Sequence, residues 1–437
     1  MTGQVDVRSL LRLDEGLVHS DVYASQDVFE LEVEKIFHRG WVYVGHESEV
    51  AKPGDYVLRW IGRQSVILNR DKDGKLHLFM NRCRHRANSI CQHESGNAAN
   101  FLCNYHGWNY RNDGALVGVP RNDAYGPDFK VEDFPLVSPR MEVYRGFVWG
   151  NLDQNGGSLA DHLGLAGQRS IDVFCDASPE GEIIVNSGCL KSLIFANWKF
   201  QGGDGYHAPF THWANAGFMR AKRKNPQARN PVGFSGGSME EGYLSRDLGN
   251  GHYCLDKRSV EGFGGGKTLP DADWARKYHD DMIKAYGEER GEFLVRTGGN
   301  PHTVFMPNLH LVNGADLRII RPLAADKCEI YFFCPLLKGA PEELNLARIR
   351  DVERRMGASG TINVDDVEMF ERNQFGMRQE VDPWKYMARG MQREHPDDDL
   401  KVPEPYRWTG TVAGHFSDEL TQRAQLRWWA DRLSGNR

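Results

Sequence analysis

The sequence predicts an α+β fold, in which a small all-β domain is inserted near the N-terminus of a larger domain that mixes helices and strands. The chain has 437 residues, more than one ordinary core needs. Residues 40–158 consist of short β-rich runs separated by turn residues, whereas both flanks contain helical patterns. We therefore expect one domain over 40–158 and a second domain formed by 1–39 together with 159–437.

The segment "SQDVFELEVEKIFHRGW" predicts the first helix. Its apolar residues recur at helical spacing and form one stripe: Phe29, Val33, Ile36 and Phe37. The helix is expected to end near Gly40. From Trp41 onwards the runs "WVYVG", "DYVLRWIG" and "GFVWGNL" predict strands, and "QSVILNRDKDGKLHLFMN" predicts a hairpin that turns at "DKDGK".

The C-terminal half mixes both kinds of element. "RIIRPLAADKCEIYFFCPLL" predicts two strands around a turn, and "EELNLARIRDVERRMG" predicts a helix directly after them. The charged, proline-bearing stretch 392–405 is expected to be a surface connection. An amphipathic helix around "DELTQRAQLRWWADRL" is expected to close the chain.

Composition excludes several classes of function. The formal net charge of −6 provides no basic field for nucleic acid. No run of 18 apolar residues is present, so we expect no membrane span. The first residues lack the apolar stretch of a secretion signal, which predicts a cytoplasmic protein. Eight cysteines would then stay reduced, and their histidine neighbours favour metal binding over disulfides.

Residues 83–108, "CRHRANSICQHESGNAANFLCNYHGW", carry more metal ligands than one small site uses. The donors are three thiols and three imidazoles: Cys83, His85, Cys91, His93, Cys103 and His106. The outer pairs, Cys83-x-His85 and Cys103-x-x-His106, are separated by 17 residues. Two thiolates on one iron and two imidazoles on the other form the ligand set of a Rieske 2Fe–2S cluster. A zinc site or a reduced structural cysteine cluster is the alternative, although C-x-H is an unusual pair for zinc.

The strings "CRHR", "CNYHGWNY" and "DGALVGVP" resemble the Rieske domain of aromatic-ring-hydroxylating oxygenases. The resemblance implies four ligands for the 2Fe–2S cluster: Cys83, His85, Cys103 and His106. It leaves Cys91 as a small buried residue and His93 as a loop residue. One departure is visible, because the family usually has glycine at the position of Ala87.

A second motif, "GDGYHAPFTH", offers His207 and His212 with Asp204 just before them. Five residues on a regular helix splay two side chains by ~140°, so a shared ion would require a distorted or π-bulged turn. Two histidines and one carboxylate on one face of an iron leave positions open for oxygen and substrate. On spacing alone, two nearby histidines are more often surface or core residues than metal ligands.

"NWK…DGYHAPFTH" resembles the mononuclear-iron motif of the same oxygenases, which implies His207 and His212 as ligands. The family's third ligand lies on a late helix as the second member of an Asp-Asp pair. "TINVDDVEMFERNQ" supplies this pair, so Asp366 is the expected ligand and Asp365 the alternative.

The same resemblance gives Asp204 a bridging role. The carboxylate would join His106 of a neighbouring subunit to His207, so that electrons cross between subunits of a trimer. A carboxylate that orients a ligating imidazole is a common arrangement. Upstream, "FQGG" is shorter than the family's usual stretch and lacks its asparagine, and whether Gln201 replaces it is left open.

The resemblance extends over nearly the whole chain, including "FHRGWVYVGHESEVAKPGDY", "HTVFMPNLHLV" and "LRIIRPL". It implies a helix-grip-like larger domain with a central antiparallel sheet and covering helices. It also implies a terminal oxygenase component that takes electrons through the Rieske cluster and hydroxylates an aromatic ring with O2 at a mononuclear Fe(II). "DGYHAPFTHW" is closer to the branch acting on single-ring aromatic acids, although an O- or N-demethylase or monooxygenase would carry the same ligands.

The sequence also indicates partners. No GxGxxG occurs, so electrons from NAD(P)H must come through a separate reductase, with or without a ferredoxin. The bridging aspartate implies a trimer, and a small beta subunit is left open. Two alternatives from other classes are an electron carrier without oxygenase activity and a zinc-stabilised binding protein.

Overall fold

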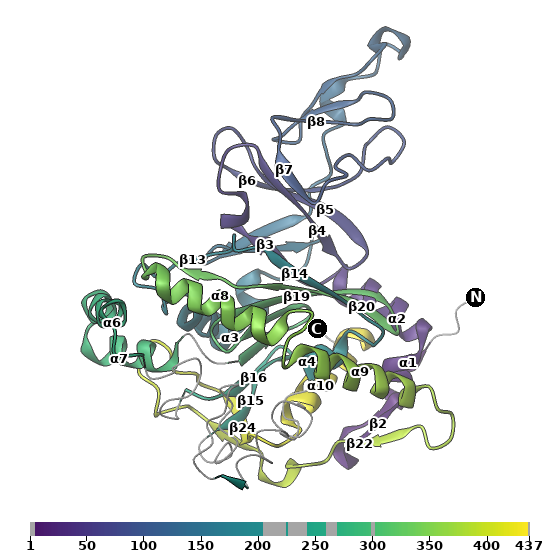
Figure 1. Ribbon diagram of the computed structural model, residues 1–437. Helices are drawn as coiled ribbons and strands as arrows, with labels where there is room; N and C mark the ends of the chain where they lie inside the picture. The colour runs from purple at the N-terminus through teal and green to yellow at the C-terminus, as the bar shows by residue number, and fades with distance from the viewer. Residues whose placement is uncertain (1–4, 204–223, 226–242, 259–268, 299–301, 436–437) are drawn as a thin grey trace. The chain divides into compact units, whose positions relative to one another are not determined.

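The computed structural model describes residues 5–203, 224–225, 243–258, 269–298 and 302–435 (Figure 1). The chain divides into two compact units. The smaller unit is Val33–Leu159, and the larger unit combines Met1–Glu32 with Ala160–Arg437. No helix among the described residues is long and apolar enough to cross a membrane.

The smaller unit is built from antiparallel β-sheets, as the sequence predicts. One sheet has the order β6-β5-β4-β7 and contains β4 (Asp55–Ile61), β5 (Gln64–Arg70), β6 (Leu76–Met80) and β7 (Ser95–Asn97). A second has the order β10-β9-β8 and contains β8 (Asn100–Leu102), β9 (Asn109–Arg111) and β10 (Leu116–Gly118). A third has the order β11-β12-β3 and contains β3 (Val42–His46), β11 (Arg140–Tyr144) and β12 (Phe147–Asn151).

The predicted hairpin at "DKDGK" joins β5 to β6. The Asp71 carboxylate accepts hydrogen bonds from the backbone N–H groups of Asp73 and Lys75, each at 2.9 Å. Its other oxygen lies 2.7 Å from Nε2 of His77. Gly74 adopts a φ of 83°, which glycine tolerates at no steric cost. An aspartate that satisfies its own turn explains why this sequence reverses the chain here.

The larger unit contains a nine-stranded antiparallel sheet with the order β14-β20-β19-β18-β17-β16-β15-β24-β23. Its strands are β14 (Cys189–Ile194), β15 (Leu244–Gly249), β16 (His252–Asp256), β17 (His302–Phe305), β18 (Leu309–Val312), β19 (Asp316–Ala324), β20 (Lys327–Phe333), β23 (His395–Asp397) and β24 (Thr411–His415). The predicted pair of strands around "AADK" is therefore confirmed as β19 and β20. Short sheets β1-β2-β22 and β13-β21 contain β1 (Leu11–Arg12), β2 (Leu17–His19), β13 (Ile183–Ile184), β21 (Leu336–Leu337) and β22 (Trp384–Tyr386).

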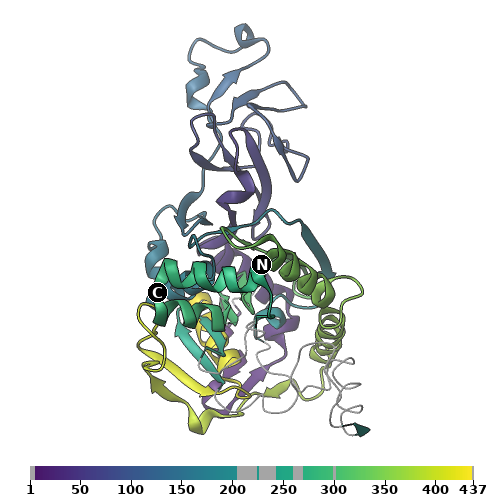
Figure 2. The same ribbon diagram turned by 60° about the vertical axis from the view of Figure 1, so that its left-hand side comes forward.

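Helices surround this sheet, which confirms the predicted central sheet with covering helices (Figures 1 and 2). They are α1 (Asp21–Ala24), α2 (Gln26–Glu32), α3 (Leu159–Cys175), α4 (Lys199–Gly203), α6 (Asp273–Tyr286), α7 (Glu288–Thr297), α8 (Glu342–Met356), α9 (Asn363–Met377) and α10 (Leu420–Ser434). The first predicted helix is confirmed as α2, which continues as a π-helical turn over Val33–Phe37. Its apolar stripe, Phe29, Val33, Ile36 and Phe37, is buried.

The prediction that 392–405 is a surface connection is wrong in part. Residues 395–397 form β23 and pair with β24, and Asp399 is buried. The Asp399 carboxylate accepts hydrogen bonds from the guanidinium groups of Arg246 and Arg258. Arg258 also lies 3.4 Å over the ring of Trp408. Asp399 can be buried because two buried arginines far away in the sequence, Arg246 and Arg258, pair with its carboxylate.

Candidate functional site

The first candidate ligand pair lies on a tight loop that begins at Cys83. The N–H of Cys83 donates to the carbonyl of Asn88 (2.9 Å), and the N–H of Ala87 donates to the carbonyl of Cys83 (3.1 Å). Ala87 adopts the left-handed conformation, with a φ of 63°. The loop buries the thiol of Cys83 and leaves His85 partly exposed.

The second pair lies on a loop with the same backbone pattern. The N–H of Cys103 donates to the carbonyl of Trp108 (2.8 Å), and the N–H of Gly107 donates to the carbonyl of Cys103 (2.9 Å). Gly107 has a φ of 73° and occupies the position that Ala87 occupies in the first loop. Cys103 is buried, and His106 is partly exposed. Each loop therefore presents one buried thiol and one imidazole closer to the surface.

The two loops bring like donors together. The ring centroids of His85 and His106 lie 4.6 Å apart at an interplanar angle of 74°. Asn88 connects the loops, because its side-chain N–H₂ lies 3.7 Å from the Cys103 sulfur. Burial, followed by electrostatic repulsion from the neighbouring His106 and Arg86, lowers the pKa of His85, which favours the neutral imidazole that a metal requires. Burial alone would raise the pKa of Cys103, but hydrogen bonds from its surroundings lower it and favour the thiolate.

These donors fit a Rieske cluster. Such a cluster takes two thiolates on one iron and two imidazoles on the other, so no iron uses more than two side chains. Among the described residues, no group of three or more His, Cys, Asp or Glu side chains is placed to hold one ion. A structural zinc site would need four ligands converging on one point. The two-plus-two arrangement therefore favours the cluster over zinc.

Two aromatic side chains behind the loops were missed by sequence reasoning. Trp108 stacks on His85, with ring centroids 5.1 Å apart and an interplanar angle of 7°. The Tyr110 hydroxyl lies 3.4 Å from the Cys83 sulfur and accepts the N–H of Arg84 at 3.0 Å. Their signal in the sequence is alternation, because Trp108 and Tyr110 follow the second ligand pair at the inward positions of an extended segment.

Cys91 and His93 lie where the resemblance places them. Cys91 is buried, and its backbone N–H and carbonyl both bind the Asn81 side chain at 2.8 Å. Burial raises the pKa of Cys91 to about 12, so its thiol stays protonated. His93 is exposed in a bend. Cys91 therefore acts as a small core residue.

Ala87 and Gly107 both adopt the left-handed conformation, so we expect exchanges between Ala and Gly at these two positions to change stability in opposite directions. Ala87→Gly should stabilise the smaller unit by up to about 1 kcal/mol, because a left-handed non-glycine residue is strained. Gly107→Ala should destabilise it by about 1–2 kcal/mol, and its new Cβ would also lie 2.8 Å from Cγ of Pro120. Thermal loss of the cluster's visible absorption measures both variants. Shifts of the same sign in the two variants would contradict this account.

The second candidate site is described in part. Asp204, His207 and His212 lie outside the described residues. Asp365 and Asp366 lie in the first turn of α9, as predicted for a helical Asp-Asp pair. The Oδ1 atom of Asp366 is buried.

Helix α9 turns the face that carries Asp366 toward α4. Phe370, one turn after Asp366, stacks on Phe200 of α4 with ring centroids 6.3 Å apart and an interplanar angle of 8°. Asp365 is rotated by ~100° around the helix from Asp366. Since α4 ends at Gly203, it leads directly into the segment that contains the predicted histidines. The geometry therefore favours Asp366 over Asp365.

Both helices lie over one face of the nine-stranded sheet, which we call the α4 face. The α4 face carries Tyr253, Val304 and His310, because residues directly opposite in antiparallel strands share a face. A Cβ on Gly202 would lie 2.5 Å from the Tyr253 hydroxyl and 3.4 Å from Nε2 of His310. At the other end of the face, the Asn363 side chain of α9 lies 3.4 Å from the Ser192 hydroxyl of β14. Buried Gln201 also lies in α4.

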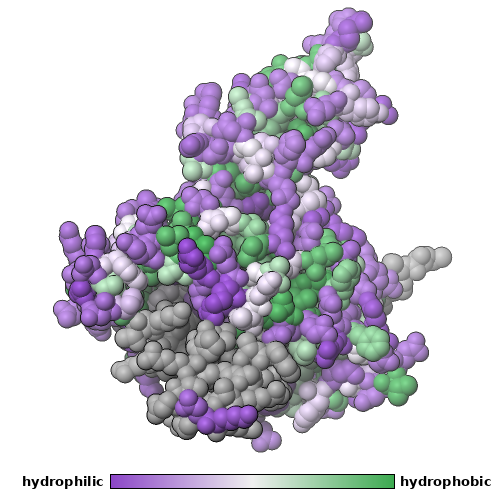
Figure 3. Space-filling model, viewed as in Figure 1, coloured by the Kyte–Doolittle hydropathy of each residue, from purple (hydrophilic) through white to green (hydrophobic). Residues whose placement is uncertain are grey.

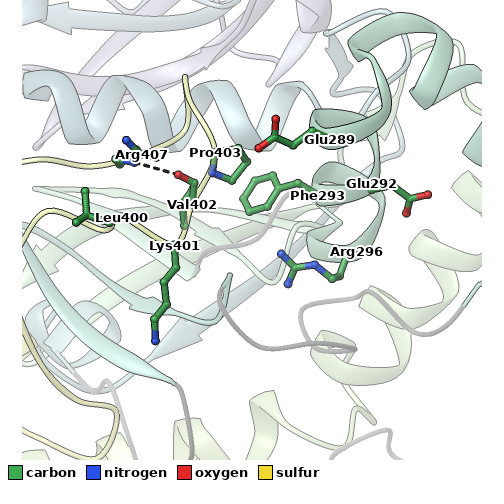
Figure 4. A pocket seen from close by; sticks show the side chains of 9 residues that line it. All are labelled: Glu289, Glu292, Phe293, Arg296, Leu400, Lys401, Val402, Pro403 and Arg407. Atoms are coloured by element: carbon green, nitrogen blue, oxygen red, sulfur yellow. Dashed lines mark hydrogen bonds between the residues drawn. The ribbon is translucent and has the colours of Figure 1, made fainter.

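A further pocket of about 330 Å³ lies away from these residues (Figure 4). It is open and is lined by α7, which carries Glu289, Glu292 and Arg296, and by the segment 400–407, which carries Lys401 and Arg407. The Arg407 side chain is held by the carbonyl of Val402 at 3.1 Å (Figure 4). This mixed charge selects no particular ligand, and the pocket contains no predicted site residue.

Comparisons with known proteins match both parts of the chain to known families. The Rieske [2Fe-2S] domain family matches residues 40–135, and the family described as ring hydroxylating alpha subunit (catalytic domain) matches 163–435. The chain is 32% identical to the anthranilate 1,2-dioxygenase large subunit of Acinetobacter baylyi, over 85% of this chain and 79% of that protein. It is also 32% identical to the toluate 1,2-dioxygenase alpha subunit of Pseudomonas putida, over 82% of this chain and 78% of that protein.

A solved structure of naphthalene 1,2-dioxygenase from Rhodococcus sp., bound to indole, superimposes with a TM-score of 0.80. It is 26% identical in sequence, and the match covers 99% of both chains.

Proposed function

Because the chain belongs to the family of Rieske-containing ring-hydroxylating oxygenase alpha subunits, we propose that it is a terminal oxygenase component acting on a single-ring aromatic acid. Its cofactors are a Rieske 2Fe–2S cluster and a mononuclear iron. The cluster supplies single electrons, and the iron supplies oxygen activation. The observation that carries the proposal is the pair of loops with matching backbone hydrogen bonds, which bring two thiols and two imidazoles together. The same chain also contains the contact between α4 and α9 beside the second candidate site.

The smaller unit would hold the cluster. We assign its ligands to Cys83, His85, Cys103 and His106, and its domain to residues 40–158. The four donors are supported by the shared loop geometry and by the proximity of the two imidazoles. Trp108 would hold the plane of His85, and the hydroxyl of Tyr110 would donate to the thiolate of Cys83.

The larger unit, residues 1–39 with 159–437, would hold the iron through His207, His212 and Asp366. Asp366 is supported by its place on the α9 face that contacts α4. Two histidines and one carboxylate form a facial set that leaves open positions beside the substrate. The rest of α9 and α4 would fix the carboxylate relative to the histidine segment.

Single-ring aromatic acids are favoured because the relatives from Acinetobacter baylyi and Pseudomonas putida are named for anthranilate and toluate. Both compounds are benzoic acids with one small substituent. The test supplies the purified protein with a surrogate reductase and measures oxygen uptake and products on benzoate, anthranilate, toluate, naphthalene and a dimethylphenylurea. Ring diols from the acids support the proposal. Demethylation of the urea without ring products would replace it with the demethylase alternative.

Alpha subunits of this family work with a reductase or ferredoxin and often form multimers. For this chain we propose an NAD(P)H-dependent reductase and a trimer, with a beta subunit as a further candidate.

Apolar residues gather at the surface of the larger unit (Figure 3). The exposed apolar side chains include Leu193 of the edge strand β14, Phe195 just after it, and Val364 and Phe375 of α9. Exposed apolar groups of this size support burial in an assembly.

We also propose that the protein works in the cytoplasm. All eight cysteines are free, and seven of them are buried. Free thiols persist in a reducing compartment.

Asp204→Asn is expected to leave both metals bound and to reduce turnover to near background. The substitution keeps the size of the side chain but removes the charge that would hold the His106 imidazole of a neighbouring subunit against His207. Metal analysis, the visible spectrum of the cluster and oxygen uptake measure the outcome. Turnover at the wild-type rate would remove the bridging role and leave the metal assignments standing.

A further inference from the structure

The α4 face of the sheet carries a line of side chains that the iron and cluster assignments do not use. Tyr253 of β16 lies opposite Val304 of β17, Val304 lies opposite His310 of β18, and His310 lies opposite Arg318 of β19. Phe332 of β20 continues the line beside Arg318. Side chains directly opposite each other are about 4.5–5.5 Å apart at Cβ. All five residues are buried, so this line is an interior wall.

His310 is a buried imidazole with unused hydrogen-bonding capacity. Only 2% of the residue is exposed, and its Nδ1 atom has no hydrogen-bond partner in the described part of the chain. Burial, and then the charge of Arg318, lowers the pKa of His310 to about 3, so the ring is neutral. A neutral imidazole has one N–H donor and one acceptor. A buried polar group without a partner is costly, so Nδ1 of His310 calls for a partner that the described residues do not supply, and a bound ligand is one that fits.

Arg318 is a buried cation next to that imidazole. Its Nε donates to the Asp316 carboxylate at 3.0 Å, and its Nη2 lies 3.4 Å from the sulfur of Met356. The guanidinium also lies 5.2 Å from the ring centroid of Phe332. These contacts fix the side chain and, within the described part of the chain, occupy two of the five N–H donors that a guanidinium carries. The remaining donors and the His310 N–H can serve one further acceptor.

This wall lies beneath the segment that leads to the candidate iron site. Gly202 of α4 comes so close that a Cβ would lie 3.4 Å from Nε2 of His310 and 3.4 Å from Cγ1 of Val304. Two residues later the chain enters the segment with the predicted ligands. The wall thus combines an apolar surface at Val304 with polar groups at His310 and Arg318, directly below α4.

We propose that His310 and Arg318 bind the carboxylate of the aromatic acid and Val304 contacts its ring, so that this wall determines the preference for acids over neutral aromatics. The proposal rests on the proposed function and names the residues behind its substrate class. A carboxylate leaves water only where a cation and hydrogen-bond donors replace its hydration. His310 and Arg318 are the side chains of this line that supply both.

The test compares kcat/KM for benzoate with kcat/KM for methyl benzoate, which has the same ring and no charge. His310→Leu should lower the benzoate to methyl benzoate ratio roughly ten- to hundredfold, because it removes one hydrogen bond to a charged group. His310→Gln retains an N–H donor and should recover part of the ratio. Thr303→Val is the matched control, since Thr303 is also buried but lies on the opposite face, beside Cys254 and Leu311.

Calorimetric binding of benzoate to the same holoenzyme variants gives a readout that is independent of turnover. Weaker binding to His310→Leu and near-normal binding to Thr303→Val support the inference. An unchanged ratio and unchanged binding in His310→Leu overturn it and leave the proposed function intact. A wild-type protein that oxidises methyl benzoate but neither binds nor oxidises acids overturns both. The visible spectrum and the iron content verify that each variant is folded, and His310→Phe, which keeps a ring and removes the N–H, replaces the leucine variant if the latter fails to fold.

Discussion

Asp366→Asn is expected to remove the mononuclear iron and to lower turnover at least about a hundredfold, while the cluster's visible spectrum persists. Substitution of groups that merely orient metal ligands typically costs 10- to 100-fold, so loss of a charged ligand should cost about as much or more. Asparagine keeps the shape of the side chain, so the effect reports the lost negative charge. Iron per subunit by metal analysis and oxygen uptake with a surrogate reductase measure the result.

Asp365→Asn is the matched control. Asp365 has the same charge, lies in the same turn of α9 and is the neighbour of Asp366. Its side chain points ~100° away around the helix, so the substitution should leave iron content and turnover near wild type. Iron loss in Asp365→Asn and not in Asp366→Asn would reverse the assignment. Loss of the cluster in either variant would contradict the partition into two metal sites.

Lys199→Met is expected to lower the free energy of unfolding of the larger unit by about 3–5 kcal/mol, because it leaves a buried carboxylate without its cation. Lys199 Nζ lies 2.5 Å from Glu32 Oε1, and both side chains are fully buried. The indole N–H groups of Trp198 and Trp429 donate to the same carboxylate at 2.7 and 2.6 Å. Burial lowers the pKa of Lys199, and the attraction of Glu32 opposes that shift. Denaturant unfolding followed by tryptophan fluorescence measures the loss.

The double variant Glu32→Gln/Lys199→Met distinguishes the effect of the two charges from the effect of side-chain packing. It removes both charges and keeps two side chains of similar size, so it should recover most of the stability that Lys199→Met loses. Because Lys199 begins α4, iron content should fall in the single variant and recover in the double variant. Equal destabilisation by the single and double variants would show that packing, and not the charge pair, holds α4.

Much of the fold follows from local patterns in the sequence. The hairpin at Asp71 forms because one side chain satisfies its own turn, and the helix of Phe29 is visible because its stripe is buried. Contacts between distant segments could not be predicted in this way. Asp399 lies in a charged stretch typical of a surface, but it is buried because Arg246, 153 residues away, donates a hydrogen bond to its carboxylate. Nothing in the local composition of 392–405 encodes that partner.

The candidate site residues also divide into those that local sequence patterns predict and those that depend on contacts between distant segments. The candidate ligand pairs around Cys83 and Cys103 are local motifs, and their spacing predicts the cluster. Asp366 required the resemblance to a family, because its partners lie far away in the sequence. His310 gave no signal, since a single histidine in an apolar strand is most often a core residue. Its significance depends on the register that places it between Val304 and Arg318.

The carboxylate of Glu32 also bears on the order in which the chain can fold during synthesis. Its partners Lys199 and Trp429 follow it by 167 and 397 residues. The smaller unit, Val33–Leu159, is contiguous, so the ribosome releases all of it before α4 exists. The larger unit cannot complete the surroundings of Glu32 until its last helix has been made. A nascent chain should therefore contain a folded smaller unit, able to bind the cluster, before α10 has been synthesised. Only then can α10 complete the contacts of Glu32 in α2.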